Sequence, residues 1–283
     1  MMQPPGGGAS WLAANLDGNT LTAWTVTGST AGTAQVQQLP DSGPAALAAG
    51  LRLLLSGDAL PVVLGGSSLV PPQRVPAVPA ELPLTATPLE GLTIHALPGL
   101  SQSVPGGLIQ GGLARLRGFL QLNPDWDGVV CLPGTAVTHW VQVSAKEAVS
   151  FQSALTGQLA AAVAQPMTLA AAGDCSMEAL AEAAADGIAK PELLAARLAA
   201  LQAEAALGQL QPDTVRGRLW GLLLGSELAA ARPYWLGQNV ALLAEAPLQP
   251  HYAAALEAQG LPVTLADPLR MTLEGLSRAW AAP

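Results

Sequence analysis

The sequence predicts a mixed α/β protein of two lobes, and three observations lead to this prediction. The chain has 283 residues, half of them hydrophobic, which is enough for more than one core. Closely spaced strand patterns with a tight turn open the chain, and strand and helix patterns alternate from residue 239 onward. Such alternation is typical of a parallel sheet with helices on its faces.

The composition indicates which kinds of binding partner and which cellular compartment to expect. Charged residues make up 11% of the chain and the net charge is −8; without a Lys/Arg cluster to neutralise phosphates, we expect no nucleic-acid partner. No run reaches the roughly 18 apolar residues of a membrane span, and the opening MMQPPGGGAS lacks the regions of a signal peptide. We therefore expect a cytoplasmic protein without membrane contact, a disordered tail at 1–10 and, because the surface is weakly charged, a tendency to form homo-oligomers.

Cysteine and histidine spacing predicts neither a metal site nor a catalytic triad. Cys131 and Cys175 lie far apart without a zinc-ligand pattern. Cys131 stands in the apolar run VVCL and is expected to be buried as a small hydrophobic residue. His95, His139 and His251 are too dispersed to suggest a Ser/His/Asp arrangement.

The first lobe is expected at residues 11–165. Its opening strands are joined by Asp17-Gly18-Asn19-Thr20, and Asp-Gly followed by Asn is a strong hairpin signal. A third strand would complete an antiparallel meander, and the helix after it has Pro44 in its first turn and Gly57 beyond its end. The prolines between residues 70 and 105 limit that segment to loops and short edge strands. The expected elements are strands 11–16, 21–27 and 33–39, helix 44–55, strand 61–65, helix 107–121, strands 128–132, 137–143 and 147–151, and helix 153–164.

The second lobe is expected at residues 166–283. It is mainly helical at first, and Gly221 and Gly225 would let one of its helices approach a neighbour closely. The alternation that closes the chain then predicts a parallel sheet. The expected elements are helices 176–187, 190–207 and 212–231, strand 239–243, helix 250–259, strand 261–265 and helix 270–281.

Three long blocks of the chain carry a resemblance to one enzyme family. The blocks are HALPGLSQSVPGGLIQGGLARLRGFLQLNPDWDGVVCLPG at 95–134, WVQVSAKEAVSFQSALTGQL at 140–159, and GLLLGSELAAARPYWLGQNVALL at 221–243 with YAAALEAQGLPV at 252–263. They resemble the 2-dehydro-3-deoxygalactonokinases (2-keto-3-deoxy-galactonate kinases). The resemblance implies the two-lobed actin-like ATPase and sugar-kinase fold, with nucleotide between the lobes. It also implies transfer of the γ-phosphoryl group of ATP, with Mg²⁺, to the 6-hydroxyl of a 2-keto-3-deoxy sugar acid.

The first hairpin departs from the family pattern D-W-G-[ST]-T-N-L-R-A-W. Alignment on the shared Leu and Trp puts Asn15 at the Asp, Asp17 at the Gly and Thr22 at the Arg, although a shift of one residue would align Gly18 with the Gly. By position, Asn15 and Gly18 are the candidates to bind nucleotide here. Asn15 lacks the charge that attracts Mg²⁺, and the Asp17 carboxylate would repel phosphate. We expect this turn to be too acidic or too closed to admit a triphosphate.

The family motif M-R-G-E-E-T-Q at a helix start is replaced by IQGGLAR at 109–115. The Arg and both carboxylates are lost, so neither a general base nor a clamp for the sugar carboxylate remains from this motif. By position, Gln110 is a candidate to bind substrate.

The motif L-P-G-T-H-[ST]-K-W survives in part as LPGTAVTHW at 132–140. Gly134 and Thr135 match and are candidates to bind nucleotide through a backbone turn. His139 is either a shifted donor to substrate or a structural residue of its strand. The family's T-G-E-L is TGQL here, which makes Gln158 a candidate to bind substrate. After the NVALL strand, Ala244-Glu245-Ala246-Pro247 replaces a Gly-containing nucleotide loop.

These losses all fall on charged or glycine positions, while scaffold segments such as ELAAARPYWLGQ persist. The pattern favours a member of the family with impaired catalysis. One alternative is a non-catalytic pseudokinase that senses a sugar acid or binds a partner protein and needs no cofactor. Another is an active kinase that uses neighbouring acids, among which Glu227 is the candidate for catalysis, whereas Asp125 and Asp127 read as turn formers.

Overall fold

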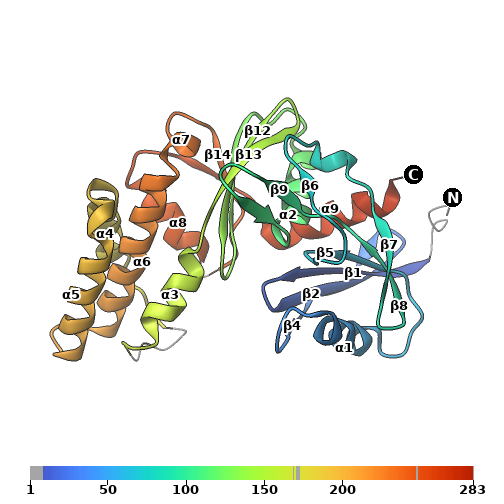
Figure 1. Cartoon of the computed structure of the whole chain (residues 1–283), viewed down its shortest axis with the longest axis horizontal. Coiled ribbons are helices and arrows are strands. Elements are labelled where there is room, and N and C mark those ends of the chain that lie inside the picture. Colours follow the sequence, from blue (N-terminus) through green and yellow to red (C-terminus); the bar gives the residue numbers. More distant parts are fainter. Residues whose placement is uncertain (1–8, 168, 170–172, 247, 283) are drawn as a thin grey trace. The chain divides into compact units, whose positions relative to one another are not determined.

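The computed structural model describes residues 9–167, 169, 173–246 and 248–282. The expected tail at 1–10 therefore lies largely outside the described residues, and Ser10 already belongs to a strand. Contacts between Cα atoms divide the chain into two compact units, the first made of Met1–Asp127, Gln142–Phe151 and Asp267–Pro283, the second of Gly128–Val141 and Gln152–Ala266 (Figure 1). This division differs from the expected lobes at 11–165 and 166–283, because a strand at Gly128 opens the second unit and the last helix returns to the first.

The main sheet of the first unit has the expected opening meander at one side and parallel strands in its middle. The strand order is β3-β2-β1-β5-β8-β7, with β4 also paired to β2. Strand β2 is antiparallel to β1, whereas β1, β5 and β8 run parallel. Helix α1 begins and ends where expected, at Pro44 and Leu55, and buries Leu47 and Leu51 in the core. The elements are β1 (Ser10–Asp17), β2 (Thr20–Thr27), β3 (Thr30–Ala31), β4 (Gln35–Gln38), α1 (Pro44–Leu55), β5 (Val62–Gly65), β7 (Thr85–Leu89) and β8 (Leu92–Ala96).

The proline-rich segment corrects two expectations. Strand β8 lies inside the sheet between β5 and β7, not at its edge, and it buries Ile94. Residues Gly107–Ile109 form strand β10, antiparallel to β9 (Leu100–Gln102), so helix α2 (Gly112–Leu122) begins later than residue 107. Strand β6 (Gln73–Arg74) completes this second, three-stranded sheet of the unit, and a short 3₁₀ helix spans Pro79–Glu81.

Helices α2 and α9 (Pro268–Ala281) cross with their backbones in contact. A Cβ atom added to Gly118 would lie 1.9 Å from the carbonyl oxygen of Met271, and one added to Gly275 would lie 1.9 Å from that of Ala114. Helix α9 also contacts β1 and β5. The last helix therefore helps to close the core of the first unit.

A five-stranded sheet contains the predicted parallel strands, and these strands belong to the second unit. Its order is β13-β12-β11-β14-β15, and β11, β14 and β15 run parallel. The buried side chains of β11 include Cys131, as expected, and its cluster extends to Trp140 and Leu224. The elements are β11 (Gly128–Pro133), β12 (Thr138–Ser144), β13 (Glu147–Ala154), β14 (Val240–Leu242), α8 (Leu248–Glu257) and β15 (Val263–Leu265).

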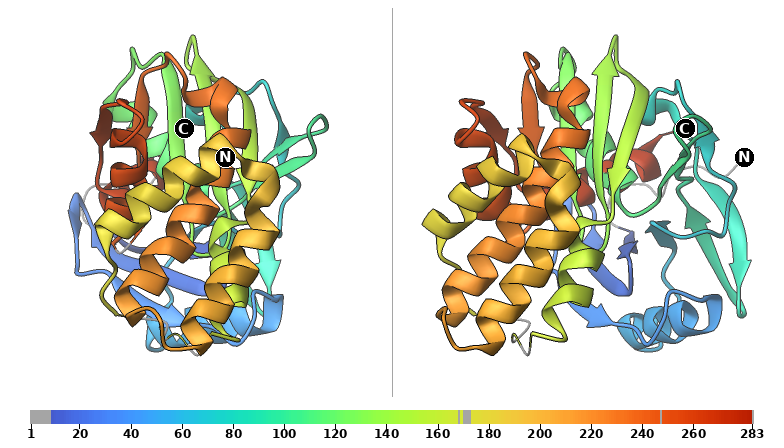
Figure 2. Two further views of the ribbon diagram at one scale, coloured as in Figure 1. Left: turned by 90° about the vertical axis from the view of Figure 1, so that its left-hand side faces the viewer. Right: turned by 60° about the vertical axis from the view of Figure 1, so that its left-hand side comes forward.

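Helices α4 (Met177–Ala189) and α5 (Leu194–Ala206) both pack against α6 (Pro212–Ala230), as Figures 1 and 2 show. Glycines on α6 make the approach of α4 close: a Cβ on Gly221 would lie 2.3 Å from the carbonyl oxygen of Leu180, and one on Gly225 would lie 2.4 Å from that of Ala184. The predicted role of these two glycines is confirmed. Helix α3 (Thr156–Ala164) also contacts α6. A short helix, α7 (Arg232–Trp235), follows α6 in the chain.

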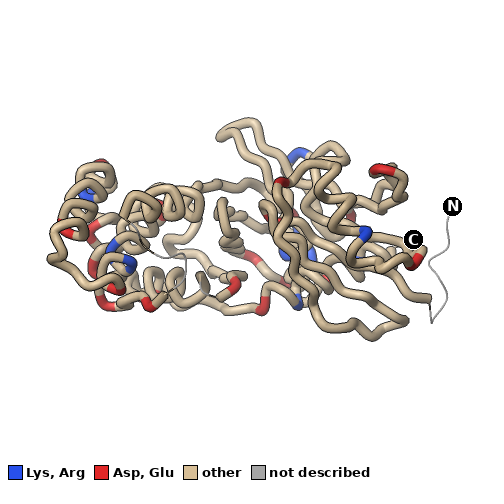
Figure 3. Tube along the Cα trace, turned by 90° about the horizontal axis from the view of Figure 1, so that it is seen from below, with Lys and Arg blue, Asp and Glu red and all other residues tan. Residues whose placement is uncertain are grey.

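Charged residues are sparse along both units, as the colours of the Cα trace in Figure 3 show. Across the part of the chain that the structure describes, no helix combines the length and apolar character needed to cross a membrane.

Candidate functional site

The turn between β1 and β2 holds two of the expected binding residues. Gly18 has φ +58°, a conformation that glycine adopts without steric cost. The amide of Asn15 is buried, and its Nδ2 donates a hydrogen bond to the carbonyl oxygen of Gly111, 3.2 Å away. The other side of this amide faces β5, because a Cβ on Gly65 would lie 2.6 Å from Asn15 Oδ1. Asn15 therefore links the end of β1 to β5 and to the start of α2.

An ion pair fixes the acidic residue of this turn. Arg115 Nη2 lies 2.9 Å from Asp17 Oδ2, and the side chains are 4% and 36% exposed, respectively. The start of α2 also packs directly on the turn, since a Cβ on Gly111 would lie 2.6 Å from the carbonyl oxygen of Leu16. Arg115, to which the motif comparison gave no role, thus neutralises the carboxylate of Asp17.

Gln110 lies in the bend just before α2, and its carbonyl oxygen accepts a hydrogen bond from the backbone of Leu113 at 3.2 Å. Because its neighbour Gly111 contacts the β1–β2 turn, the structure brings Gln110, Asn15 and Gly18 to the same end of the first sheet. These three expected residues therefore lie in one region of the first unit, and their roles in binding stay predictions.

A second region forms where the loop after β11 meets the start of α3. The backbone of Gly134 donates to the carbonyl oxygen of Val137 at 3.0 Å, and that of Gln158 donates to Ala136 at 3.0 Å. A Cβ on Gly157 would lie 2.2 Å from the carbonyl oxygen of Thr135. Gly134, Thr135 and Gln158 are therefore held together, although the Gln158 side chain is exposed.

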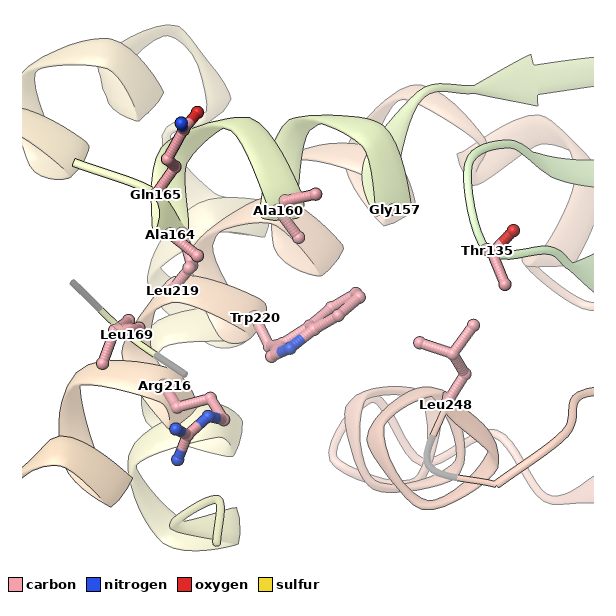
Figure 4. Close-up of a pocket in the computed structure, with 11 residues that line it drawn as sticks. Thr135, Gly157, Ala160, Ala164, Gln165, Leu169, Arg216, Leu219, Trp220 and Leu248 are labelled. Carbon is pink, nitrogen blue, oxygen red and sulfur yellow. The ribbon is translucent and has the colours of Figure 1, made fainter. Parts of the chain in front are cut away.

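A pocket of about 620 Å³ lies beside this loop, entirely within the second unit. Its volume falls within the range of about 300–1,000 Å³ typical of small-molecule sites. Figure 4 shows the indole of Trp220 reaching from α6 toward Leu248 and Thr135, with Arg216 one helical turn away. The lining residues are Thr135, Gly157, Ala160, Ala161, Ala164, Gln165, Leu169, Arg216, Leu219, Trp220 and Leu248.

The chemistry of the pocket suits a flat apolar group with a polar end. Alanine and leucine side chains form most of its wall, and the indole of Trp220 offers a surface for stacking. The imidazole of His251 supports this indole, with 5.2 Å between the ring centroids. Burial lowers the pKa of His251, which favours its neutral form. Sequence reasoning missed Trp220 and Arg216; their spacing of four residues on one helix is the signal that could have paired them.

Glu227 lies in the core rather than at an open catalytic position. Its carboxylate accepts hydrogen bonds from Trp140 Nε1 at 2.8 Å, from Tyr252 OH at 3.0 Å and from Thr156 Oγ1. The hydroxyl groups of Tyr252 and Thr138 also share a hydrogen bond. Burial raises the pKa of Glu227 to about 7, and the three hydrogen bonds oppose that rise. Because Thr156 precedes the pocket residue Gly157, Glu227 is placed to position the start of α3.

The other candidates do not join this cluster. His139 is buried on β12 and its Nδ1 lies 2.8 Å from Ser153 Oγ; its neighbour Trp140 points to the opposite face, toward Glu227. Asp127 accepts a hydrogen bond from Ser144 Oγ at 2.8 Å. Glu245 is exposed and its carbonyl oxygen accepts from Gln249 at 3.0 Å, at the start of α8, whereas Pro247 of the same segment lies outside the described residues. Within the described ranges, no three His, Cys, Asp or Glu side chains gather closely enough to hold a metal ion.

Comparison with known proteins gives concordant results. The family model of 2-keto-3-deoxy-galactonokinase matches residues 16–279. The 2-dehydro-3-deoxygalactonokinase of Escherichia coli (strain K12) is 27% identical over 274 residues, which cover 90% of this chain and 92% of that protein.

Solved structures agree on the fold. A 2-dehydro-3-deoxygalactonokinase protein from Sinorhizobium meliloti superposes with a TM-score of 0.82 at 24% identity, covering 95% of each chain. The activator of the 2-hydroxyisocaproyl-CoA dehydratase from Clostridium difficile, solved with bound ADPNP, gives a TM-score of 0.53 at 8% identity and covers 96% of this chain and 94% of that one. The architecture is the actin-like ATPase and sugar-kinase fold expected from the sequence.

Proposed function

The chain belongs to the 2-keto-3-deoxy-galactonokinase family, and from this premise we propose that it binds the ligands of such a kinase while its phosphoryl transfer is impaired. The observation that carries the proposal is the state of the ionisable groups at the family's motif positions. The Arg and both carboxylates of the family's helix-start motif are absent, Asp17 of the first hairpin is paired with Arg115, and Glu227 is buried.

Binding of ATP is supported by the pocket of the second unit. Its volume of about 620 Å³ and its Trp220 ring suit a nucleoside, and the fold neighbour from Clostridium difficile holds ADPNP. Thr135 and the backbone at Gly157, at the start of α3, offer polar groups beside this pocket. Mg²⁺ is commonly bound through one or two carboxylates and the phosphates of its nucleotide, so it would arrive with ATP.

Impaired transfer is supported by the residues around the β1–β2 turn and by Glu227. Phosphoryl transfer needs neutralised phosphate charge and a group that takes the proton of the attacking hydroxyl. The turn carries the Asp17 carboxylate, which repels phosphate, at the position where the family has a glycine. Glu227, the remaining acidic candidate, already accepts hydrogen bonds from three buried donors.

Two other hypotheses differ from this proposal in how much phosphoryl transfer the protein retains. Complete loss of transfer would make the protein a pseudokinase that senses a sugar acid or binds a partner protein. Full activity would require groups outside the recognised motifs.

Turnover and binding, measured separately, test the proposal. We expect calorimetry to detect ATP–Mg²⁺ and 2-keto-3-deoxygalactonate, and a coupled assay to give turnover far below the roughly 1–100 s⁻¹ of typical kinases. Turnover within that range would contradict impaired transfer. Absence of binding by both ligands would contradict the assignment of ligands.

A further inference from the structure

Three helices that line the pocket of the second unit meet at the buried carboxylate of Glu227. We propose that Glu227 and Thr156 are positioning residues of this pocket, and that the pocket binds a nucleoside more tightly when Glu227 is ionised than when it is protonated. The inference rests on the nucleotide ligand proposed above. It adds the residues that hold the walls of the pocket in place and a proton that controls its affinity.

Helix α3 forms one wall of the pocket and is bonded to Glu227 at its first residue. Its lining residues share one face of the helix (Figure 4): Gly157, Ala160, Ala161 and Ala164. Leu155, which precedes the helix, has an apolar side chain that cannot cap it, whereas Thr156 Oγ1 donates to Oε2 of Glu227. Gly157 also touches the loop after β11, since a Cβ there would lie 2.2 Å from the carbonyl oxygen of Thr135. A change in the bond from Thr156 to Glu227 therefore acts directly on this wall.

The walls on α6 and α8 are tied to the same carboxylate. Glu227 belongs to α6, on which Trp220 lines the pocket about two turns earlier. Tyr252 lies about one turn beyond the lining residue Leu248 on α8, and its hydroxyl donates to Glu227 at 3.0 Å. Glu227 thus fixes how closely α3 and α8 approach α6, and with them the width of the pocket.

Protonation of Glu227 must alter this arrangement, because the groups bonded to its carboxylate act as donors. Trp140 Nε1 donates to Oε1 at 2.8 Å, and an indole N–H cannot accept a hydrogen bond. The acid proton is therefore expected on Oε2, which faces the hydroxyl groups of Thr156 and Tyr252. One of these hydroxyl groups must then accept, and the bond to Thr156 becomes one between neutral groups, about half as strong as a bond to a carboxylate. Ionised Glu227 consequently holds the start of α3 more tightly.

Glu227 is the group of this cluster that changes charge near neutral pH. Burial raises its pKa to about 7, while its three hydrogen bonds favour the ionised form. Burial raises the pKa of Tyr252 well above its ordinary value and lowers that of His251, so both are neutral at that pH. Cys131 of β11 is buried in the same hydrophobic cluster.

The other ionisable residues around the cluster point away from Glu227 or lie nearer the surface. His139 of β12 lies on the opposite face of its strand from Trp140. The ionisable residues on the other helices packed against α6, and the last one on α8, are exposed or half-buried: Glu178, Glu182, Asp186, Glu192, Arg197, Glu204, Arg232, Tyr234 and Glu257.

The inference is tested by calorimetric titration of the whole protein with adenosine at several pH values. Adenosine has no phosphate, so repulsion between phosphate and Glu227 does not enter the pH dependence. We expect the wild type to bind adenosine about three- to tenfold more tightly at about pH 8 than at about pH 5, since one unit of pKa change on binding corresponds to tenfold in affinity. Glu227→Gln, which keeps the shape of the side chain without the charge, should give a flat profile.

Variants of Thr156 separate the hydrogen bond from packing. Thr156→Val keeps the size of the side chain but not its hydroxyl, and we expect its affinity at about pH 8 to fall about tenfold. Thr156→Ser restores the hydroxyl and should restore both the affinity and its pH dependence. Thr272→Val is the matched control, because it removes a buried hydroxyl that donates within α9 to the carbonyl oxygen of Pro268 at 2.8 Å, and its profile should equal that of the wild type.

Hydrogen exchange reports the position of α3 without any ligand. The backbone N–H of Gln158 donates to the carbonyl oxygen of Ala136 at 3.0 Å, so its protection measures how firmly the start of α3 is held on the loop after β11. We expect this protection to fall in Thr156→Val and to recover in Thr156→Ser.

Several results would overturn the inference. One is adenosine binding with the same pH profile in the wild type and in Glu227→Gln, which would point to another titrating group such as His251 and leave the proposed ligands standing. Another is unchanged protection of Gln158 in Thr156→Val. Failure of adenosine to bind at any pH would overturn it as well, whereas binding of ATP–Mg²⁺ in that case would still support the function proposed above.

Discussion

At the scale of single residues, Glu227 combines an ionisable group with complete enclosure. A buried carboxylate is destabilised by the loss of water, and donors such as Trp140 and Tyr252 offset part of that loss. Its pKa near 7 reflects the balance between these effects. A residue that first looked like a surviving catalytic acid is better described as the centre of a buried hydrogen-bond cluster that ties α6 to β12, α8 and α3.

This cluster makes stability depend on pH in a way that Glu227→Gln should remove. The pKa of Glu227 in the folded protein is raised to about 7 from an ordinary value of 4.5. The stabilising contribution of its protonated form is therefore complete below about pH 4.5 and is lost as the pH rises through about 7. Between pH 5 and 8 the free energy of unfolding of the wild type should fall relative to that of Glu227→Gln, by up to about 3 kcal/mol.

Urea unfolding at several pH values would measure this difference. Glu274→Gln, which changes a partly exposed carboxyl paired with Arg278, should give a curve parallel to that of the wild type. A Glu227→Gln curve that also stays parallel would contradict the raised pKa.

Motif position alone could group single residues of the chain, whereas contacts that join distant segments could not be predicted. Asn15, Gly18 and Gln110 were chosen by motif position, and the structure places them together. The partnership of Asp17 with Arg115 spans 98 positions, and no local pattern in either segment indicates it. Glu227 could be named as a candidate, but its burial depends on side chains from three other elements.

At the scale of elements, the close packing of α4 against α6 depends on glycines of α6, which have no side chain. Gly221 allows the helices to approach until a Cβ would lie 2.3 Å from the carbonyl oxygen of Leu180 and 2.7 Å from the Cβ of Ala183. Both neighbours belong to a helix backbone or lie close to it, so they can yield only if the helices separate.

Gly221→Ala should therefore destabilise the protein despite the better helix propensity of alanine. The gain in propensity is about 1 kcal/mol, whereas overpacking costs about 1–3 kcal/mol and occasionally more. We expect a net decrease in the free energy of unfolding, measured by denaturant titration. Gly106→Ala is the control, because a Cβ at Gly106 meets nothing within 4 Å, and equal effects of the two substitutions would show that contact with α4 is not the cause.

Element prediction succeeded where local signals decide and failed where pairing decides. Helix α1 has the predicted limits because Pro44 and Gly57 mark its ends within the sequence itself. The start of α2 was misplaced because Gly107–Ile109 pairs with β9, a contact that helix periodicity does not report. Strand β8 was expected at an edge because of the prolines around it, yet its partners β5 and β7 enclose it.

At the scale of the whole molecule, the pocket lies within one of two units, so a ligand there should stabilise that unit first. ATP at about 100 times its dissociation constant should add about 2.7 kcal/mol to the free energy of unfolding. Trp220→Ala should remove most of this gain, because the indole provides the stacking surface of the pocket.

Thermal unfolding with and without ATP–Mg²⁺ would measure the gain for each variant against its own ligand-free form. Leu207→Ala is the control within the same unit, since Leu207 is 71% exposed and does not line the pocket. If Trp220→Ala kept the full gain, the nucleotide would have to bind elsewhere.

The division into units also shows what a prediction made from consecutive sequence segments cannot give. The expected boundary at residue 165 treated each lobe as one continuous segment, but the first unit is assembled from three separate segments. Strand alternation predicted the parallel pairing of β14 and β15 correctly. It could not predict that α9, which follows them, packs on α2.

Because α9 packs on α2, the core of the first unit can be completed only after the last helix of the chain has been synthesised. A ribosome releases residues 268–281 only after it has made all of 128–266, so the second unit can fold while the first still lacks its closing helix. During that interval the backbone around Gly118 and the adjoining strands have no cover. The nascent chain therefore exposes an unfinished core for the time needed to translate an entire unit, and chaperones that recognise apolar surface have that interval in which to act.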